Sequence, residues 1–328
     1  MPRLSGVVGL IVLCGLLLTG CSFGGAKTGD GNGAAPSGKL KVVASIYPVY
    51  DFAKHIGGDK AEVSCLVPPG AEPHDWEPSP KDIIVLQRAD VFVYCGAGME
   101  QWVAKALENI DQTRLLAVDA GKNVELLTGS GQYYHRTAGS ETGEAALMNT
   151  ANVDPHIWLD PLNAAVMVEN ITAALVKADP ANQSYYERNA AAYRGQLMAL
   201  HKEYQAQLGG AKGKSFVTSH AAFGYLAKRY GLIQLPLRGL SPEAEPTPAR
   251  MAEVVQLVRE EKIRYIFFES LVSPKVSEVI AAETGAGTLV LNPLDGLTAG
   301  EIAGGADYLT VMRENLVNLQ RSFGLANE

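Results

Sequence analysis

Cysteine is scarce in this sequence of 328 residues, and its scarcity excludes a disulfide framework. Of the four cysteines, Cys14 and Cys21 lie near the N-terminus, which leaves only Cys65 and Cys95 for the folded part. Both stand in apolar, strand-like runs, and no CxxC spacing pairs them for a metal. We expect buried free thiols, with a single disulfide as the alternative.

Basic charge and the common hydrolase motifs are also lacking. Charged residues make up only 19% of the chain and its formal net charge is −7, which argues against a nucleic-acid partner. The HExxH motif, the GxSxG elbow and the Walker A loop are absent. These motifs supply the metal-bound base, the nucleophile and the phosphate cradle of many hydrolases. We therefore predict a binding protein rather than an enzyme.

The N-terminus has the pattern of an export signal. Arg3 precedes an apolar run over residues 7–18 that is too short to cross a bilayer comfortably. The run ends in LTGC, and small residues before a cysteine are typical of a lipobox. We predict a signal peptide over residues 1–20, lipidation of Cys21, and a flexible Gly/Ser/Ala tether over residues 21–38. An ordinary signal peptide with a chance cysteine is the alternative. No later segment resembles a membrane span.

After the tether, short β-branched runs alternate with longer helical stretches. The expected strands are 41–46, 62–67, 91–95, 114–118, 215–218, 232–235, 265–268 and 288–291. The expected helices are 48–56, 80–88, 100–109, 161–177, 181–208, 222–230, 248–260, 275–283 and 304–319. Alternating order predicts parallel sheets covered by helices, hence an α/β fold. The uninterrupted stretch 181–208 predicts one helix of about 40 Å.

This helix divides the folded part in two. We predict an N-terminal α/β lobe over residues 39–180, a connecting helix over 181–210 and a C-terminal α/β lobe over 211–328. A polar, glycine-rich stretch near residues 128–151 is too long for an ordinary connection and is interpreted as a mobile surface loop.

Three of the six histidines stand at junctions between elements. His74 lies in GAEPHDWEPSP, directly after an expected strand, and His156 lies in DPHIWLDP. Prolines stiffen both segments, and ligands of open α/β sheets bind beyond the carboxyl ends of the strands. Turn or packing roles are the alternatives. Asp154 or Asp160 could accept the second ring N–H of His156 and fix its tautomer.

The second half offers a matching set. His220 follows the expected strand 215–218, although Ser219 could cap a helix in which His220 is merely a first-turn residue. Asp295, in NPLDG, follows the last strand, with an ordinary turn role as its alternative. Glu269 is the competing carboxylate and could instead support a ligand. Three imidazoles and a carboxylate suit a tetrahedral Zn²⁺ site.

The blocks GAEPHDWEPSP, DPHIWLDP, TSHAAFGYLAKRYG and NPLDGLT, in this order, resemble the metal-binding lipoproteins of zinc and manganese ABC importers. The resemblance covers about residues 39–328. It implies two lobes joined by one long rigid helix, a metal site in the cleft between them, and delivery of the ion to an importer permease.

The resemblance also implies a ligand set of His74, His156, His220 and Asp295. Histidine at position 220 favours zinc, because manganese-type members commonly have glutamate there. Asp295 is a departure, since the closest pattern has glutamate. A second departure is the single His135 where many zinc-type members have a histidine-rich stretch.

We therefore expect a monomeric, lipid-anchored zinc receptor with four protein ligands and no open coordination position. Zinc affinity should fall below about pH 6, the usual imidazole range, and lobe movements should be small. The alternatives are a manganese or iron receptor of the same fold, a zinc hydrolase, and an adhesin, a label that this family also carries.

Overall fold

The computed structural model describes residues 38–127 and 153–325. One compact unit, Gly38–Glu328, contains every described element and its hydrophobic core. Within the described ranges, no helix is both long and apolar enough to cross a membrane.

Several expectations concern residues that the structure does not describe. The signal peptide, Cys21 and the tether lie outside the described residues, as do His135 and the glycine-rich loop.

The N lobe is built on the first parallel sheet. Its elements are β1 (Leu40–Ala44), α1 (Tyr47–Gly57), β2 (Ala61–Cys65), α2 (Pro80–Gln87), β3 (Val91–Tyr94), α3 (Val103–Glu108), β4 (Leu116–Asp119) and α4 (Pro161–Ala178). The strands pair in the order β2-β1-β3-β4, all parallel. In the register, Val42 lies opposite Val63 on one side and Val91 on the other.

The C lobe repeats this topology. After α5 (Gln183–Gln207) come β5 (Ser215–Thr218), α6 (Gly224–Tyr230), β6 (Ile233–Pro236), α7 (Pro248–Glu260), β7 (Tyr265–Phe268), α8 (Lys275–Thr284), β8 (Gly287–Val290), α9 (Ala299–Ala303) and α10 (Tyr308–Phe323). The strand order is β6-β5-β7-β8, again all parallel. Two α/β lobes and a long helix confirm the predicted fold class.

Side-chain caps start several helices where the sequence predicts it. The Ser79 hydroxyl and backbone N–H both donate to Asp82 at the start of α2. Asp160 accepts from the Leu162 N–H ahead of α4, whose first residue is proline. A proline at this position loses no hydrogen bond, and the cap satisfies an otherwise orphaned donor.

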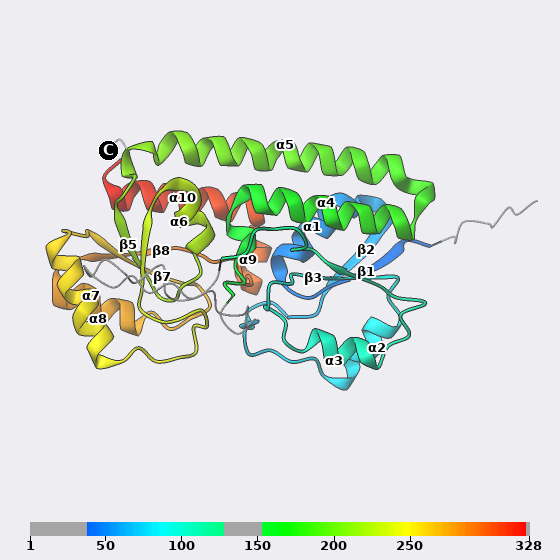
Figure 1. Cartoon of the computed structure of the whole chain (residues 1–328), viewed down its shortest axis with the longest axis horizontal. Coiled ribbons are helices and arrows are strands. Elements are labelled where there is room, and N and C mark those ends of the chain that lie inside the picture. The colour runs from blue at the N-terminus through cyan, green and yellow to red at the C-terminus, as the bar shows by residue number, and fades with distance from the viewer. Residues whose placement is uncertain (1–37, 128–152, 326–328) are drawn as a thin grey trace, which may run out of the picture. The chain divides into compact units, whose positions relative to one another are not determined.

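The long helix α5 links the lobes through one apolar stripe. Its buried residues recur every three or four positions: Tyr186, Ala190, Tyr193, Leu197, Leu200 and Tyr204. The Tyr193 hydroxyl donates to Asp51 of α1 in the N lobe, and the Tyr204 hydroxyl donates to the Met312 carbonyl of α10 in the C lobe. Figure 1 shows α5 lying across α4 and α10. At 1.5 Å per residue the helix is about 38 Å long.

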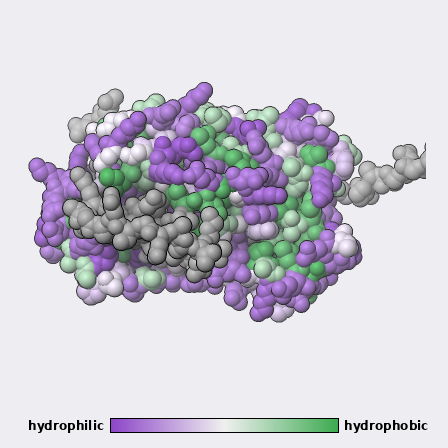
Figure 2. Space-filling view, in the orientation of Figure 1, coloured by the Kyte–Doolittle hydropathy of each residue, from purple (hydrophilic) through white to green (hydrophobic). Residues whose placement is uncertain are grey.

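One hydrophobic cluster runs through both lobes without a break, from Val42 of β1 to Leu319 of α10. Two smaller clusters lie under α2 and α3 in the N lobe and under α7 and α8 in the C lobe. The face in Figure 2 carries mostly hydrophilic residues around its rim. The continuous core favours a rigid pair of lobes, because close-packed interiors resist shear.

One local expectation is wrong, and one alternative is excluded. The helix predicted over 304–319 begins later, because α10 (Tyr308–Phe323) starts after Asp307, which caps it by accepting from the Thr310 N–H. The short helix α9 (Ala299–Ala303) before it was not predicted. Gly305 has a φ of 84°, a left-handed conformation that breaks the helix. His220 is also not a first-turn residue, because α6 begins only at Gly224.

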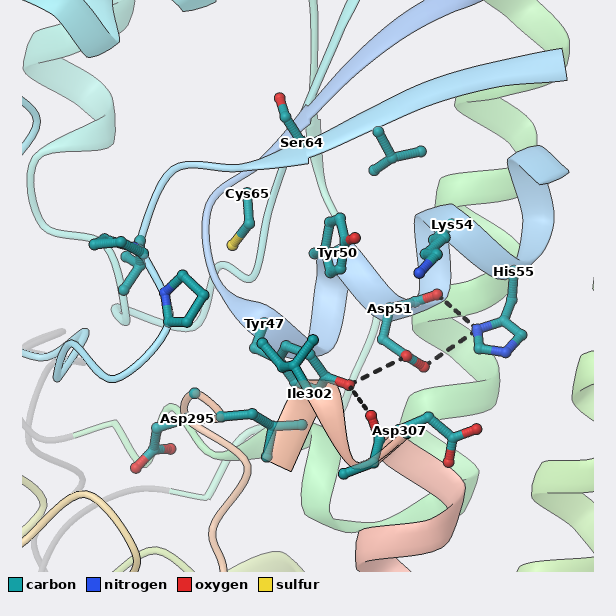
Figure 3. Close-up of a pocket in the computed structure, with 18 residues that line it drawn as sticks. Tyr47, Tyr50, Asp51, Lys54, His55, Ser64, Cys65, Asp295, Ile302 and Asp307 are labelled. Carbon is teal, nitrogen blue, oxygen red and sulfur yellow. Dashed lines mark hydrogen bonds and ion pairs between the residues drawn. The ribbon is translucent and has the colours of Figure 1, made fainter. Parts of the chain in front are cut away.

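A cavity of about 750 Å³ opens between α1, β2 and the chain around Asp295. Tyr47, Asp51 and His55 line its N-lobe wall, and Asp307 lies on the opposite wall (Figure 3). Asp295 stands at one end of the cavity. The three junction histidines do not line it, so the cavity adjoins the candidate site without containing it.

Candidate metal centre

The four predicted residues lie together where the two lobes meet. His74 follows β2, His156 precedes α4, His220 follows β5 and Asp295 follows β8. One ligand atom from each lies within 4.8 Å of the other three. Because carboxyl ends of parallel strands share one edge of a sheet, two facing lobes bring these loops to a common point.

The imidazole nitrogens stand at zinc-like spacing. His156 Nε2 is 3.1 Å from His74 Nε2 and 3.2 Å from His220 Nε2. A tetrahedral zinc ion with bonds of 2.0–2.1 Å would separate its ligand atoms by about 3.3 Å. Asp295 is slightly further out, with its two oxygens each 3.9 Å from one of these nitrogens.

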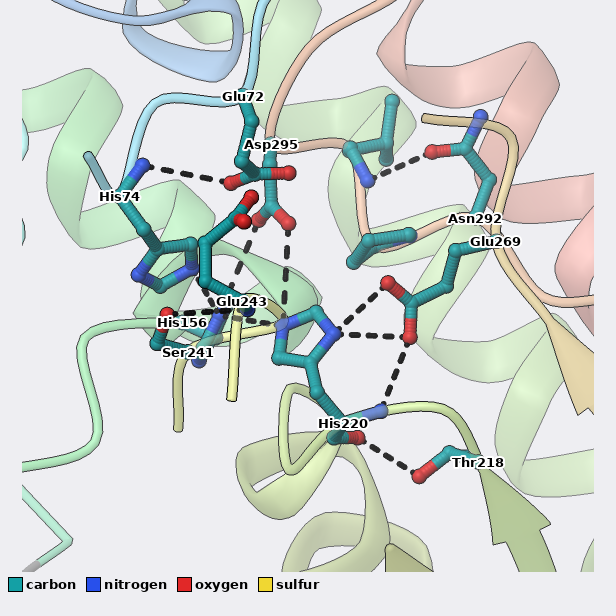
Figure 4. Close-up of polar contacts among 12 residues, drawn as sticks. Glu72, His74, His156, Thr218, His220, Ser241, Glu243, Glu269, Asn292 and Asp295 are labelled. Atoms are coloured by element: carbon teal, nitrogen blue, oxygen red, sulfur yellow. Dashed lines mark hydrogen bonds and ion pairs between the residues drawn. The ribbon is translucent and has the colours of Figure 1, made fainter. Parts of the chain in front are cut away.

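Carboxylates orient the two fully buried histidines. The Nδ1–H of His156 donates to Asp154 at 2.8 Å, and that oxygen also accepts from the His156 backbone N–H. The Nδ1 of His220 is 2.8 Å from both oxygens of Glu269 (Figure 4). With Nδ1 used this way, each ring directs Nε2 toward the centre. Such partners fix the tautomer and increase the ring's basicity.

The charge states follow from burial and neighbours. Burial, together with the charges of the other two rings, lowers the pKa of His74 to about 2. Burial also lowers the pKa of His156 well below its usual value. Burial lowers the pKa of His220 too, but the charges of Glu269 and Asp295 outweigh it and raise this pKa to about 9. At neutral pH the cluster therefore holds one imidazolium, His220, whose Nε2–H faces His156.

Asp295 has the least favourable environment of the group. It is 1% exposed, and neither of its oxygens accepts a hydrogen bond from the described residues. Burial raises its pKa well above the usual range, and the charge of Glu72 adds to the effect. A buried carboxylate without partners costs several kcal/mol, roughly, unless a cation faces it. Among the described residues the cation that faces Asp295 is the His220 imidazolium at 3.9 Å, and a divalent metal bound to the three imidazoles would take that place.

Comparison with known proteins agrees with this geometry. The sequence model of the family described as "Zinc-uptake complex component A periplasmic" matches residues 42–322. The chain belongs to this family of zinc-uptake proteins. Bacillus subtilis (strain 168) has a relative described as "High-affinity zinc uptake system protein ZnuA", 42% identical over 313 residues, covering 95% of this chain and 96% of the relative.

A second relative is longer. The "Zinc-binding lipoprotein AdcA" of Streptococcus pneumoniae is 41% identical over 317 residues, covering 95% of this chain but only 60% of AdcA. The solved Zn(II)-bound ZnuA-like domain of that AdcA has a TM-score of 0.73, with 87% of this chain and 99% of the domain covered at 41% identity. The laminin-binding protein Lmb of Streptococcus agalactiae, described as an adhesin with metal-transporting activity, has a TM-score of 0.75 at 33% identity, with 88% and 100% covered.

Three of the four loops of the site are fastened to the opposite lobe. The Tyr225 hydroxyl of α6 donates to the Asp154 carbonyl, next to His156. The Trp158 indole N–H donates to the Pro293 carbonyl at 2.8 Å, in the loop that carries Asp295.

The His74 loop is tied to the C lobe as well. The Gly70 N–H donates to the Leu297 carbonyl at 2.9 Å. These bonds preorganise the site across the lobes, so an arriving ion has little backbone left to order.

The other predicted positions have distinct places. Glu269 supports His220 and is not part of the four-atom cluster. Asp160 caps α4 and pairs with Arg229, so Asp154 alone supports His156. Cys65 and Cys95 are free thiols, as expected.

Sequence reasoning missed one acidic residue, Glu72. Its carboxylate lies beside that of Asp295 in Figure 4 and accepts from the His74 backbone N–H at 3.3 Å. Burial raises its pKa to about 7. The sequence pattern that could have identified Glu72 is its position in GAEPHDWEPSP, only two residues before His74.

Proposed function

We propose that this protein is an extracytoplasmic receptor that binds Zn²⁺ through His74, His156, His220 and Asp295 and delivers it to an ABC-type importer. One observation carries the proposal: three imidazole nitrogens and a buried carboxylate that accepts no hydrogen bond from the described residues converge within 4.8 Å. Membership of the zinc-uptake family and the Zn(II)-bound state of a solved relative support it.

The donor set favours zinc over manganese. Imidazole is a borderline-soft ligand that suits Zn²⁺, whereas Mn²⁺ prefers carboxylate and water oxygens in six-coordinate sites. Four protein donors fill a tetrahedral shell, so no position remains for a water that the metal could activate. The ion is therefore cargo, and the site serves capture and release rather than hydrolysis.

Release requires local movement rather than wide opening. The continuous core and α5 fix the lobes, and the cross-lobe bonds of Tyr225 and Trp158 join their loops. We infer that the permease loosens one ligand loop. The Asp295 loop is a good candidate, because Leu294 has a strained φ of 60° that the Asn292 side chain holds by accepting from its N–H.

The N-terminal pattern gives the cellular setting. We infer that residues 1–20 direct export and that lipidated Cys21 tethers a monomeric receptor to the outer surface of the membrane. Mass spectrometry of the membrane-extracted protein tests this, with a diacylglyceryl group on an N-terminal Cys21 expected. A mature chain that begins at another residue would contradict it.

Elemental mass spectrometry tests the metal directly. The unit of residues 38–328 is purified with zinc and manganese both supplied, as wild type, His220→Ala and a matched His201→Ala control. His201 lies on α5 and is not part of the cluster. We expect one zinc per chain in the wild type and control, and much less in His220→Ala. Manganese in the wild type would overturn the metal assignment, and zinc retained by His220→Ala would overturn the site.

A further inference from the structure

The candidate site is closed to solvent on nearly every side. His156 and His220 are fully buried, and Asp295, Glu269 and Asp154 are at most 3% exposed. The side chains around the centre that reach the solvent are half-buried His74, Glu72 and Ser241 and exposed Glu243 (Figure 4). A metal ion that travels between solvent and the buried nitrogens therefore crosses this rim, where Glu72 and Glu243 carry the carboxylates.

Glu72 is held in position for such an encounter. One of its oxygens accepts the His74 backbone N–H, which ties the carboxylate to the loop of a candidate ligand. Its other oxygen accepts no hydrogen bond from the described residues. In Figure 4 the Glu72 and Asp295 carboxylates lie side by side above the histidines. Asp295 lies deeper in the protein than Glu72, and its two buried oxygens accept no hydrogen bond from the described residues.

An ion entering this site has a solvation problem. Aqueous Zn²⁺ must lose its waters before the buried nitrogens replace them, and a bare divalent ion in a dry interior is very costly. A carboxylate at the boundary lowers that cost, because it replaces a water before the last waters leave. The same oxygen can receive the ion again when it departs.

We propose that Glu72 is the carboxylate on which zinc is first held on arrival and last held on departure, through a direct oxygen–metal bond made only in transit. Glu243, in the loop after β6, is the competing carboxylate: it lies close to Glu72 in Figure 4, but it is exposed, and its carboxylate accepts no hydrogen bond from the described residues. This inference rests on the proposed function, because it takes zinc as the cargo.

A transit ligand has a kinetic signature. Removing it raises the barrier in both directions, so association and dissociation slow together and the equilibrium changes little. A carboxylate that acts only through its charge behaves differently. Its loss slows association, speeds dissociation or leaves it unchanged, and has less effect at high salt.

Stopped-flow fluorescence of the unit 38–328 measures both rates. Trp158 is the reporter, since its ring lies 5.4 Å from that of His156. Free Zn²⁺ starts association, and excess EDTA starts dissociation. We expect Glu72→Gln to slow both rates about tenfold while Kd changes less than about threefold, at low and high salt alike. Glu243→Gln should change either rate less than about threefold.

Glu72→Asp distinguishes the effect of side-chain length from that of charge, because it keeps the carboxylate but shortens the side chain by one methylene. We expect it to behave like Glu72→Gln. Wild-type rates in either Glu72 variant would overturn the proposal, as would faster dissociation or an equal effect of Glu243→Gln. A wild-type protein that binds no zinc would instead refute the proposed function.

Discussion

Zinc must displace protons from this site, and their number can be worked out. The pKa of His220 is raised to about 9, so its ring is charged at pH 7.5 and must lose a proton before Nε2 can bind metal. His74 and His156 have lowered pKa values and are already neutral. Burial raises the pKa of Asp295 well above its usual range, and the charge of His220 opposes this shift.

The sign and size follow from linkage. A group with a pKa of about 9 lies about 1.5 units above pH 7.5, so proton competition at His220 weakens zinc binding about 30-fold, or about 2 kcal/mol. Because one proton leaves His220, zinc affinity should rise about tenfold for each pH unit between pH 7 and 8 and level off near pH 9. The sequence alone places this change near pH 6, because it does not reveal the contact of His220 with Glu269.

Isothermal titration calorimetry at pH 7.5, in buffers with different ionisation enthalpies, counts the released protons. We expect about one per zinc, released by His220. Glu269→Gln removes the charge that raises the pKa of His220, so the count should fall by about one. Loss of the carboxylate that orients the His220 ring should by itself weaken zinc binding about 10–100-fold. The measured increase in Kd should be smaller than this, because the ring no longer has to lose a proton before it binds zinc. Zinc binding with no proton release would refute this reasoning.

Three further predictions concern buried hydrogen bonds, two beside the candidate site and one within the N lobe. Asp154→Asn should weaken zinc binding about 10–100-fold, measured by chelator competition, because the partner that orients His156 is altered. Glu100→Gln should lower the free energy of unfolding by about 1–3 kcal/mol in urea denaturation, because this buried carboxylate accepts two backbone N–H groups. Tyr225→Phe should cost about 1–3 kcal/mol in the same assay and also weaken zinc binding, because the Asp154 carbonyl and the Leu127 N–H lose their shared partner.

Matched controls separate these effects from general damage. Asp59→Asn and Glu108→Gln alter exposed carboxylates, and Tyr50→Phe alters a half-buried ring. Each should change stability by less than about 0.5 kcal/mol and leave zinc affinity unchanged. If a control variant lost as much stability or zinc affinity as the test variant it is paired with, the role assigned to the test residue would be contradicted.

The fold class could be predicted because the pattern is local. β-branched runs alternate with helical stretches, and only parallel sheets covered by helices satisfy that order. The short helix α9 and the late start of α10 were missed, because that start depends on the left-handed conformation of Gly305 and on the Asp307 cap.

The candidate site was predicted to the extent that it follows from topology. Strand-to-helix junctions of a parallel sheet share one edge, so the sequence places His74 at that edge of the first sheet and His220 at that edge of the second. The choice between Glu269 and Asp295 needed three dimensions, because only the structure shows which carboxylate faces Nδ1 and which faces Nε2. Glu72 was missed because its role depends on solvent access, which no local pattern records.

X-ray absorption spectroscopy of the zinc-loaded 38–328 unit tests the central claim most directly. We predict a four-coordinate ion with three imidazole nitrogens and one carboxylate oxygen at about 2.0–2.1 Å, and the loss of one imidazole in His220→Ala. Fewer than three imidazoles in the wild type, or a sulfur ligand, would contradict the account.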